Sequence, residues 1–315
     1  MRRIVFGIVA VVVIVAAALF VLNRDRPYDR SFDTRITTPA YPDSGPVVLY
    51  DEGHRNTHLT TTGYKPLADL IRNDGYVLRT TTAPFTAEAL RGVGVLVLVL
   101  PLGSNPTNDS AAYSQKEAVA IAEWVGSGGS LLLVTDHWPF GLAARSLASR
   151  FAVELSGGFV EDRTYHDPER GESHLVFTTE NGLLGDHAIT RGRGEAERVR
   201  RVLTFTGGSM KGPDGATFFL ELSDSATVRP PGPARAERDG GNERVLMSYG
   251  DPQPAGGHAQ GVALEFGRGR VVVLGEAGML RAQQERSGAL VGMNVPGYDN
   301  RQLALNIMHW LSRVL

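Results

Sequence analysis

Residues 46–58, PVVLYDEGHRNTH, join a short apolar run to a dense group of polar side chains. Val47, Val48 and Leu49 are typical of a buried strand, and acidic, histidine and amide residues begin two positions later. In open α/β sheets, ligands bind at the carboxyl ends of the strands, where the loops leave the core. This stretch therefore predicts a parallel strand that ends at a functional site.

The same change from apolar to polar residues occurs twice more, in LLLVTDH at residues 131–137 and in VVVLGEAG at residues 271–278. A run at residues 93–100 is apolar at every position but Gly94, which indicates a strand covered on both faces. Apolar residues at helical spacing follow most of these strands, so the sequence predicts an α/β domain. We expect helices at residues 64–73, 86–91, 114–125, 142–151 and 301–314.

Two local patterns define element ends. Ser114 stands three residues before Glu117 at the start of a predicted helix, which is the spacing of a capping box. Residues 261–274, GVALEFGRGRVVVL, predict a hairpin that turns at residues 267–269.

The composition of the chain excludes several classes of function. A chain of 315 residues with 42% hydrophobic and 21% charged residues is ordinary for a folded protein with a sizeable core. The net charge of −2 and the absence of a basic stripe argue against a nucleic-acid partner. The chain contains no cysteine, which excludes disulfides, thiolate metal ligands, a lipoprotein anchor and a cysteine nucleophile.

The N-terminus carries a membrane signal. Residues 4–22 are 19 consecutive apolar residues, close to the roughly 20 that a helix needs to cross a bilayer. Arg2 and Arg3 precede them, which predicts a cytoplasmic N-terminus and a single-pass protein whose C-terminal domain is extracytoplasmic. Small residues at 16–18 leave a cleaved secretory signal as the alternative, although the apolar run is longer than the roughly 7–15 residues of such signals.

The remaining chain divides by composition. Residues 23–45 are polar and contain prolines, so they predict a juxtamembrane linker that spaces the domain from the bilayer. Residues 46–314 form the α/β domain. Within it, residues 153–249 consist of short β-prone runs separated by glycine, proline and charge, which predicts a β-rich insertion.

Polar residues at the predicted strand ends are the candidate site, because parallel strands end at one edge of a sheet. We expect this edge to bind a small polar ligand, a glycan or a protein partner, including a membrane protein. The candidate ligand-binding residues are Asp51, Glu52, His54, Asn56, Asp136, His137, Glu276 and Asn294.

A divalent metal is the alternative, because imidazole and carboxylate together suit zinc or manganese. The chain would then be a metal-dependent hydrolase that also uses Asp51, with Glu52 or Glu276 as general base. The HRNTH stretch lacks the glutamate that follows the first histidine in the metalloprotease helix motif. Without a metal, no cofactor is expected. The candidate metal ligands are His54, His58, Asp136 and His137.

A structural interpretation of the same residues stays open, because acidic residues at strand ends often cap the next helix. Motifs for a serine nucleophile elbow, a phosphate-binding loop or a dinucleotide fold are not found in the sequence. No catalytic residue is therefore assigned.

Three motifs together resemble a bacterial family. DEGHRNTH, GGSLLLVTDHWPFG and the C-terminal GEAGM, GMN and DNRQLALNIMHWL are similar to membrane-tethered proteins that carry a domain of unknown function. That domain looks like the class I glutamine amidotransferase fold, which is flavodoxin-like. The resemblance implies a doubly wound, mostly parallel sheet over most of residues 46–314. It does not imply amidotransferase activity, which needs a cysteine at a strand-to-helix elbow. Relatives include accessory proteins of transport systems, so the resemblance implies a binding or scaffold role.

Overall fold

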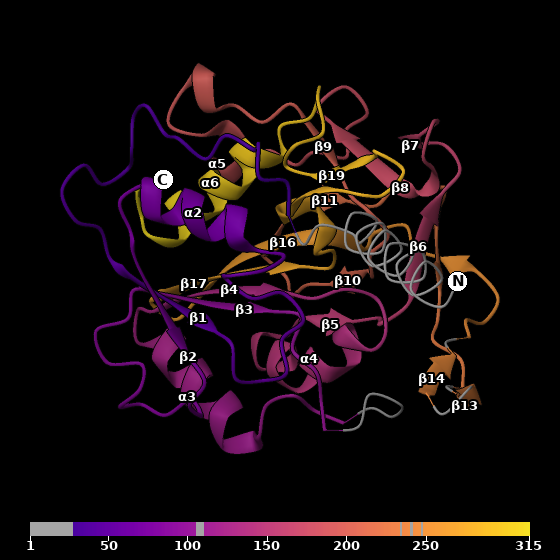
Figure 1. The fold of residues 1–315 in the computed structure, drawn as a ribbon, viewed down its shortest axis with the longest axis horizontal. Coiled ribbons are helices and arrows are strands. Elements are labelled where there is room, and N and C mark those ends of the chain that lie inside the picture. The colour runs from indigo at the N-terminus through magenta and orange to yellow at the C-terminus, as the bar shows by residue number, and fades with distance from the viewer. Residues whose placement is uncertain (1–27, 105–109, 234, 240–241, 247) are drawn as a thin grey trace, which may run out of the picture.

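A largely parallel sheet forms the centre of this mixed α/β protein (Figure 1). The computed structural model describes residues 28–104, 110–233, 235–239, 242–246 and 248–315. Adjacent parallel strands are, in order, β2 (Val77–Thr81), β1 (Val47–Asp51), β3 (Val95–Val99), β4 (Ser130–Val134) and β17 (Gly269–Leu274). The sheet continues with antiparallel β16 (Ala259–Phe266), β10 (Met210–Lys211) and β5 (Glu154–Leu155), while β11 (Thr217–Glu221) also pairs with β16. The predicted α/β class with a mostly parallel sheet is confirmed.

Helices cover both faces of the parallel strands, as Figure 1 shows. α2 (Lys65–Asn73) and α6 (Asn300–Leu311) lie on one face, and α3 (Gln115–Gly126) and α4 (Phe140–Ala148) on the other. Successive side chains alternate between the two faces of a strand. In β3, Val97 packs on the α2–α6 face and Leu96 and Leu98 on the α3–α4 face. Both faces are therefore buried, which explains why these strands show no polar alternation.

The local patterns have mixed outcomes. The Ser114 capping box is present, with Ser114 Oγ accepting from the Glu117 N–H and Glu117 accepting from the Ser114 N–H. The hairpin is confirmed as β16 and β17. The helix predicted at residues 86–91 is wrong, because that stretch forms only turns. It has room for little more than one helical turn before Gly92, which takes a positive φ of 75°.

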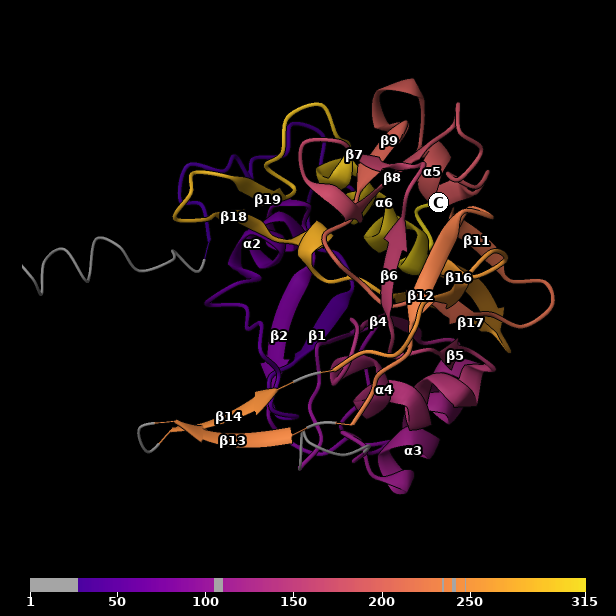
Figure 2. The same ribbon diagram turned by 90° about the vertical axis from the view of Figure 1, so that its right-hand side faces the viewer.

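Short strands fill the region between residues 153 and 249. They are β6 (Phe159–Asp162), β7 (His166–Asp167), β8 (Gly171–Thr178), β9 (Arg201–Leu203), β12 (Ala226–Arg229), β13 (Arg235–Asp239) and β14 (Asn242–Leu246), besides β5, β10 and β11. α5 (Ala188–Arg191) packs on α6. β15 (Gln253–Pro254) pairs with β12, and β18 (Ala282–Gln284) with β19 (Leu290–Gly292). Figure 2 shows that the β13–β14 hairpin projects from the body.

Residues 28–45, which we call the N-terminal strap, pack on the domain. The Asp29 N–H donates to the Ala282 carbonyl of β18 at 2.7 Å. Tyr41 lies 5.0 Å from Tyr76 in an edge-to-face contact, and its hydroxyl donates to a carbonyl after α6. The strap therefore holds together the start of the described chain, β18 and the end of α6.

Within the described residues, no helix is long and apolar enough to cross a membrane. The span predicted at residues 4–22 lies outside them.

Candidate functional site

A cavity of about 590 Å³ lies beyond the carboxyl ends of β4 and β17, within the size range of about 300–1,000 Å³ of small-molecule sites. We call it the β4–β17 pocket. Its lining is His58, Asp136, His137, Glu169, Arg170, His174, Phe205, Thr206, Glu276, Ala277, Gly278, Arg281, Gln283, Glu285, Ala289 and Val291.

Two carboxyl groups come from adjacent parallel strands. Val134 of β4 is in register with Leu274 of β17, and Asp136 and Glu276 each follow two residues later. Neighbouring strands lie about 4.8 Å apart, so this register brings the two side chains into one part of the pocket. The Ala277 N–H donates to Asp136 Oδ2 at 3.2 Å, which ties the two strand ends together.

Both carboxyl groups are poorly solvated. Glu276 is fully buried, and the Asp136 side chain is 13% exposed. Burial raises the pKa of Asp136 well above its usual value, and the Glu276 carboxyl raises it further. Burial also raises the pKa of Glu276, although backbone N–H groups, including that of Met279 at 2.8 Å, oppose the shift. Two interacting buried carboxyl groups disfavour double ionisation, so the pair holds a proton at higher pH than free carboxylates do.

The histidines that line the pocket favour the neutral state. Burial, followed by the charge of Arg281, lowers the pKa of His58 to about 4. Burial also lowers the pKa of His137, whose Nδ1 lies 2.8 Å from the Tyr249 hydroxyl. Neutral imidazoles offer one donor and one acceptor each, so they suit recognition of a polar ligand.

The β-rich region supplies a wall that the sequence did not predict. Arg170, His174 and Phe205 line the pocket from this region, and Arg170 lies over the Phe205 ring at 5.7 Å. Arg281 lines it from the residue before β18. None of these residues follows a parallel strand, so the strand-end pattern gave no signal for them.

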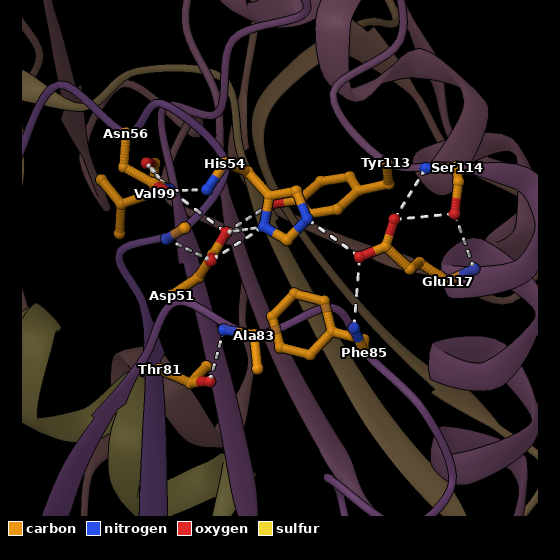
Figure 3. Close-up of polar contacts among 11 residues, drawn as sticks. Asp51, His54, Asn56, Thr81, Ala83, Phe85, Val99, Tyr113, Ser114 and Glu117 are labelled. Atoms are coloured by element: carbon orange, nitrogen blue, oxygen red, sulfur yellow. Dashed lines mark hydrogen bonds and ion pairs between the residues drawn. The ribbon is translucent and has the colours of Figure 1, made fainter.

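A second group of predicted residues forms a separate network around His54 (Figure 3). His54 Nδ1 lies 2.9 Å from Asp51 Oδ1, and Nε2 lies 2.9 Å from Glu117 Oε1. The imidazole also stacks on Phe85 at 5.3 Å. The Tyr113 hydroxyl donates to Asp51 at 3.2 Å. We call these five residues, with Asn56, the His54 network.

The charge of His54 follows from its partners. Burial lowers its pKa, but the hydrogen bonds and charges of Asp51 and Glu117 outweigh burial and raise it. Carboxylate oxygens only accept, so both contacts are hydrogen bonds only when both ring nitrogens carry protons. The network is therefore a buried imidazolium between two carboxylates, and Asp51 itself is fully buried.

Strand parity explains why the candidates form two groups. Residues two apart on a strand point to the same face, so Asp51 lies on the α3–α4 face with Leu49. By the same rule, Asp136 and Glu276 lie on the α2–α6 face with Val134 and Leu274. The strands do end at one edge, but their polar side chains leave on opposite faces, with β3 between β1 and β4.

Glu52 and Asn294 belong to neither group, whereas Asn56 of the His54 network also anchors its loop. Glu52 Oε1 accepts from the Thr60 N–H at 2.8 Å and from its hydroxyl at 2.7 Å. Asn294 Nδ2 donates to Asp29 of the strap and to the Gln283 carbonyl, both at 3.1 Å. Asn56 Nδ2 donates to the Val99 carbonyl at 2.8 Å, which holds the loop after β1 against β3.

The predicted metal ligands are divided in the same way. His58, Asp136 and His137 line the pocket, whereas His54 is held by Asp51 and Glu117. In the part of the chain that the structure describes, no three His, Cys, Asp or Glu side chains form a group that could hold a metal ion.

Comparisons with known proteins concern the fold. No family model and no curated protein sequence matches this chain. The N-terminal domain of mmIFT52 matches with a TM-score of 0.54 at 14% identity, over 84% of this chain and 97% of that one. A putative ThuA-like protein from Bacteroides uniformis gives a TM-score of 0.38 at 14% identity, over 90% and 95% of the two chains. One from Parabacteroides merdae gives 0.41 at 11%, over 85% and 90%. The first shows a shared fold alone, and the lower TM-scores carry no further argument.

Proposed function

We propose that this chain is a membrane-anchored protein whose extracytoplasmic α/β domain binds a small polar ligand in the β4–β17 pocket. The observation that carries the proposal is the pair of carboxyl groups, the fully buried Glu276 and the largely buried Asp136, beside a cavity of small-molecule size.

Burial of these two carboxyl groups has an energetic cost. A buried carboxyl group destabilises a fold unless it is neutralised or paired. Glu276 accepts from backbone N–H groups, and the charge of Arg281 also favours its ionised form. Asp136 accepts from backbone N–H groups, and the His137 ring lies 3.6 Å from it. Ionisable groups with shifted pKa values that share a cleft are typical of functional sites. The arrangement is well suited to donate to and accept from a polar ligand.

The membrane part of the proposal rests on the 19 apolar residues at 4–22 and the arginines before them. The absence of cysteine supports a role without amidotransferase chemistry. No contact in the described residues favours the metal-dependent hydrolase, because its predicted ligands are divided between the pocket and the His54 network.

The test is thermal unfolding of the full chain in detergent with a panel of sugars, amino acids and phosphorylated amines. A ligand of the pocket should raise the Tm of wild type, because binding to the folded state alone stabilises it. The Asp136→Asn and Glu276→Gln variants should lose that increase. Glu221→Gln is the matched control, because Glu221 lines a different cavity.

The control should keep the full increase in Tm. A compound that stabilises all four proteins equally would bind elsewhere, and a panel without any stabilising compound would remove the support for this function.

A further inference from the structure

The strap fixes where the N-terminal segment meets the domain, and that point is the pocket rim. Asp29 pairs through its N–H with the carbonyl of Ala282. Ala282 stands between Arg281 and Gln283, both of which line the β4–β17 pocket. Asn294 adds a bond to the Asp29 carboxylate at 3.1 Å. The described chain therefore begins beside the cavity.

The length of chain before this point limits the distance from the pocket to a membrane. The predicted span ends at Leu22, seven Cα steps before Asp29. Each step extends the chain by at most about 3.6 Å, so the end of the span lies within roughly 25 Å of Asp29. The headgroup layer occupies roughly 5–8 Å of that distance. The predicted span would therefore hold the rim within about 20 Å of the lipid headgroups.

The charges of the pocket suit a zwitterion. Asp136 and Glu276 bring a pair of carboxyl groups to the cavity. Arg170 and Arg281 bring guanidinium groups to the same cavity, and guanidinium recognises phosphate well. An ammonium group with three N–H donors matches the carboxyl pair, whereas a trimethylated amine has no hydrogen to donate.

We propose that the β4–β17 pocket binds the ammonium–phosphate headgroup of a membrane lipid, with the ammonium at Asp136, the more exposed member of the carboxyl pair with Glu276, and the phosphate at Arg170 and Arg281. This inference rests on the proposed function and on the predicted span. It specifies both the ligand chemistry and its source.

The first experiment measures thermal unfolding of the full chain in vesicles of phosphatidylethanolamine or of phosphatidylcholine, each with the same fraction of phosphatidylglycerol. The ethanolamine lipid should raise the Tm by roughly 5–10 °C over the choline lipid, as expected for a ligand at about 100 times its Kd. The Glu276→Gln variant should lose this difference and Glu221→Gln should keep it. Soluble phosphoethanolamine, ethanolamine and inorganic phosphate are tested in detergent to separate a lipid source from a free ligand.

The second experiment locates the pocket relative to the bilayer. Since the natural chain has no cysteine, Ser287→Cys and Ser127→Cys each give a single labelling site. Ser287 is exposed in the turn between β18 and β19, and Ser127 is exposed at the end of α3, near the amino end of β4. Energy transfer to a headgroup-labelled lipid should be stronger from position 287.

The outcomes separate this inference from the proposed function. Equal Tm values in the two lipids, equal or reversed energy transfer, or failure of the chain to associate with vesicles would overturn the lipid inference. The ligand-binding part of the proposed function would survive that result if a soluble polar compound still stabilised wild type but not Glu276→Gln, whereas failure to associate with vesicles would also overturn its membrane part. Loss of both effects would overturn both.

Discussion

Replacing His54 with alanine tests the buried imidazolium directly. The change leaves Asp51, which is fully buried, and Glu117, whose side chain is 11% exposed, without the cation between them. Removing one partner of a buried ion pair costs about 3–5 kcal/mol. Asp51 keeps bonds from the Gly53 N–H and the Tyr113 hydroxyl, so we expect the low end, about 3 kcal/mol at pH 6. That corresponds to a fall in Tm of roughly 6–12 °C.

The pH dependence distinguishes a charged His54 from a neutral one. The folded-state pKa of His54 is raised above the unfolded value, which is about 6.5. Its stabilising contribution is therefore complete below about pH 6.5 and is lost as the pH rises through the folded-state pKa. The pKa of Glu117 is lowered, so Glu117 stays ionised throughout this range. The difference in unfolding free energy between wild type and His54→Ala should shrink from pH 6 to pH 9.

Urea unfolding of the full chain in detergent at pH 6 and pH 9 provides the measurement, with His187→Ala as control. Burial lowers the pKa of His187 to about 4, so its side chain is neutral in the folded state at both pH values while the unfolded state loses its proton near pH 6.5. The cost of replacing His187 should therefore rise slightly from pH 6 to pH 9, which is the opposite sign to that expected for His54. A cost for His54→Ala that is constant, or that grows with pH, would refute the charged network. A double-mutant cycle with Glu117→Gln then measures the pairwise part of the energy.

Three further changes test the pocket, the cap and the strap. Because the pKa of Glu276 is raised in the folded state, its contribution to stability falls as the pH rises above the unfolded pKa of about 4.3. The free energy of unfolding of Glu276→Gln, measured in urea, should therefore rise relative to that of wild type from pH 5 to pH 9. A parallel pH response of both proteins would contradict the shift. Ser114→Ala removes the hydroxyl that caps α3 and binds Glu117, and should cost about 1 kcal/mol in the same assay. No change in the unfolding midpoint would show that the cap does not contribute. Gly75→Ala places a Cβ 1.8 Å from a strap carbonyl, whereas Gly92→Ala, also at positive φ, meets no atom within 4 Å. Both variants should be destabilised by the roughly 1–2 kcal/mol that a residue with a Cβ costs in the left-handed conformation. Gly75→Ala should be destabilised clearly more, because of the contact with the strap. Equal Tm values for the two variants would mean that the strap yields without cost.

The sequence predicted the sheet because strand runs buried on both faces are easy to recognise. β3 and β4 contain no polar residue that would mark one face as exposed, apart from Ser130 at the start of β4. The capping box of α3 was equally local, so it was also predicted correctly. These features depend on neighbours within a few residues, and no distant contact alters them.

The candidate site was predicted only in part, because convergence at a sheet edge does not fix the face. Asp51 and Asp136 both follow parallel strands, yet the parity of each strand directs their side chains to opposite faces. Counting positions from Leu49 and Val134 would separate them only if the face of each strand were known beforehand. Arg170 and Phe205 depend on how the β-rich region folds back over the sheet, which requires long-range contacts that no local pattern encodes.

The strap changes what the predicted linker can do. Twenty-three residues, 23–45, could extend roughly 75–80 Å as a free spacer and would let the domain sample a large volume above a membrane. The hydrogen bond at Asp29 leaves six residues, 23–28, between it and the predicted span. The bond from the Asp29 N–H to the Ala282 carbonyl places that contact at the pocket rim, because Arg281 and Gln283 on either side of Ala282 line the pocket. A ligand carried by the bilayer then meets the pocket at high local concentration, because the reach of the domain is short. Weakening the strap by Gly75→Ala should therefore reduce lipid-dependent stabilisation even though Gly75 does not line the pocket. Unchanged stabilisation in ethanolamine-lipid vesicles would show that the strap does not hold the pocket near the headgroups.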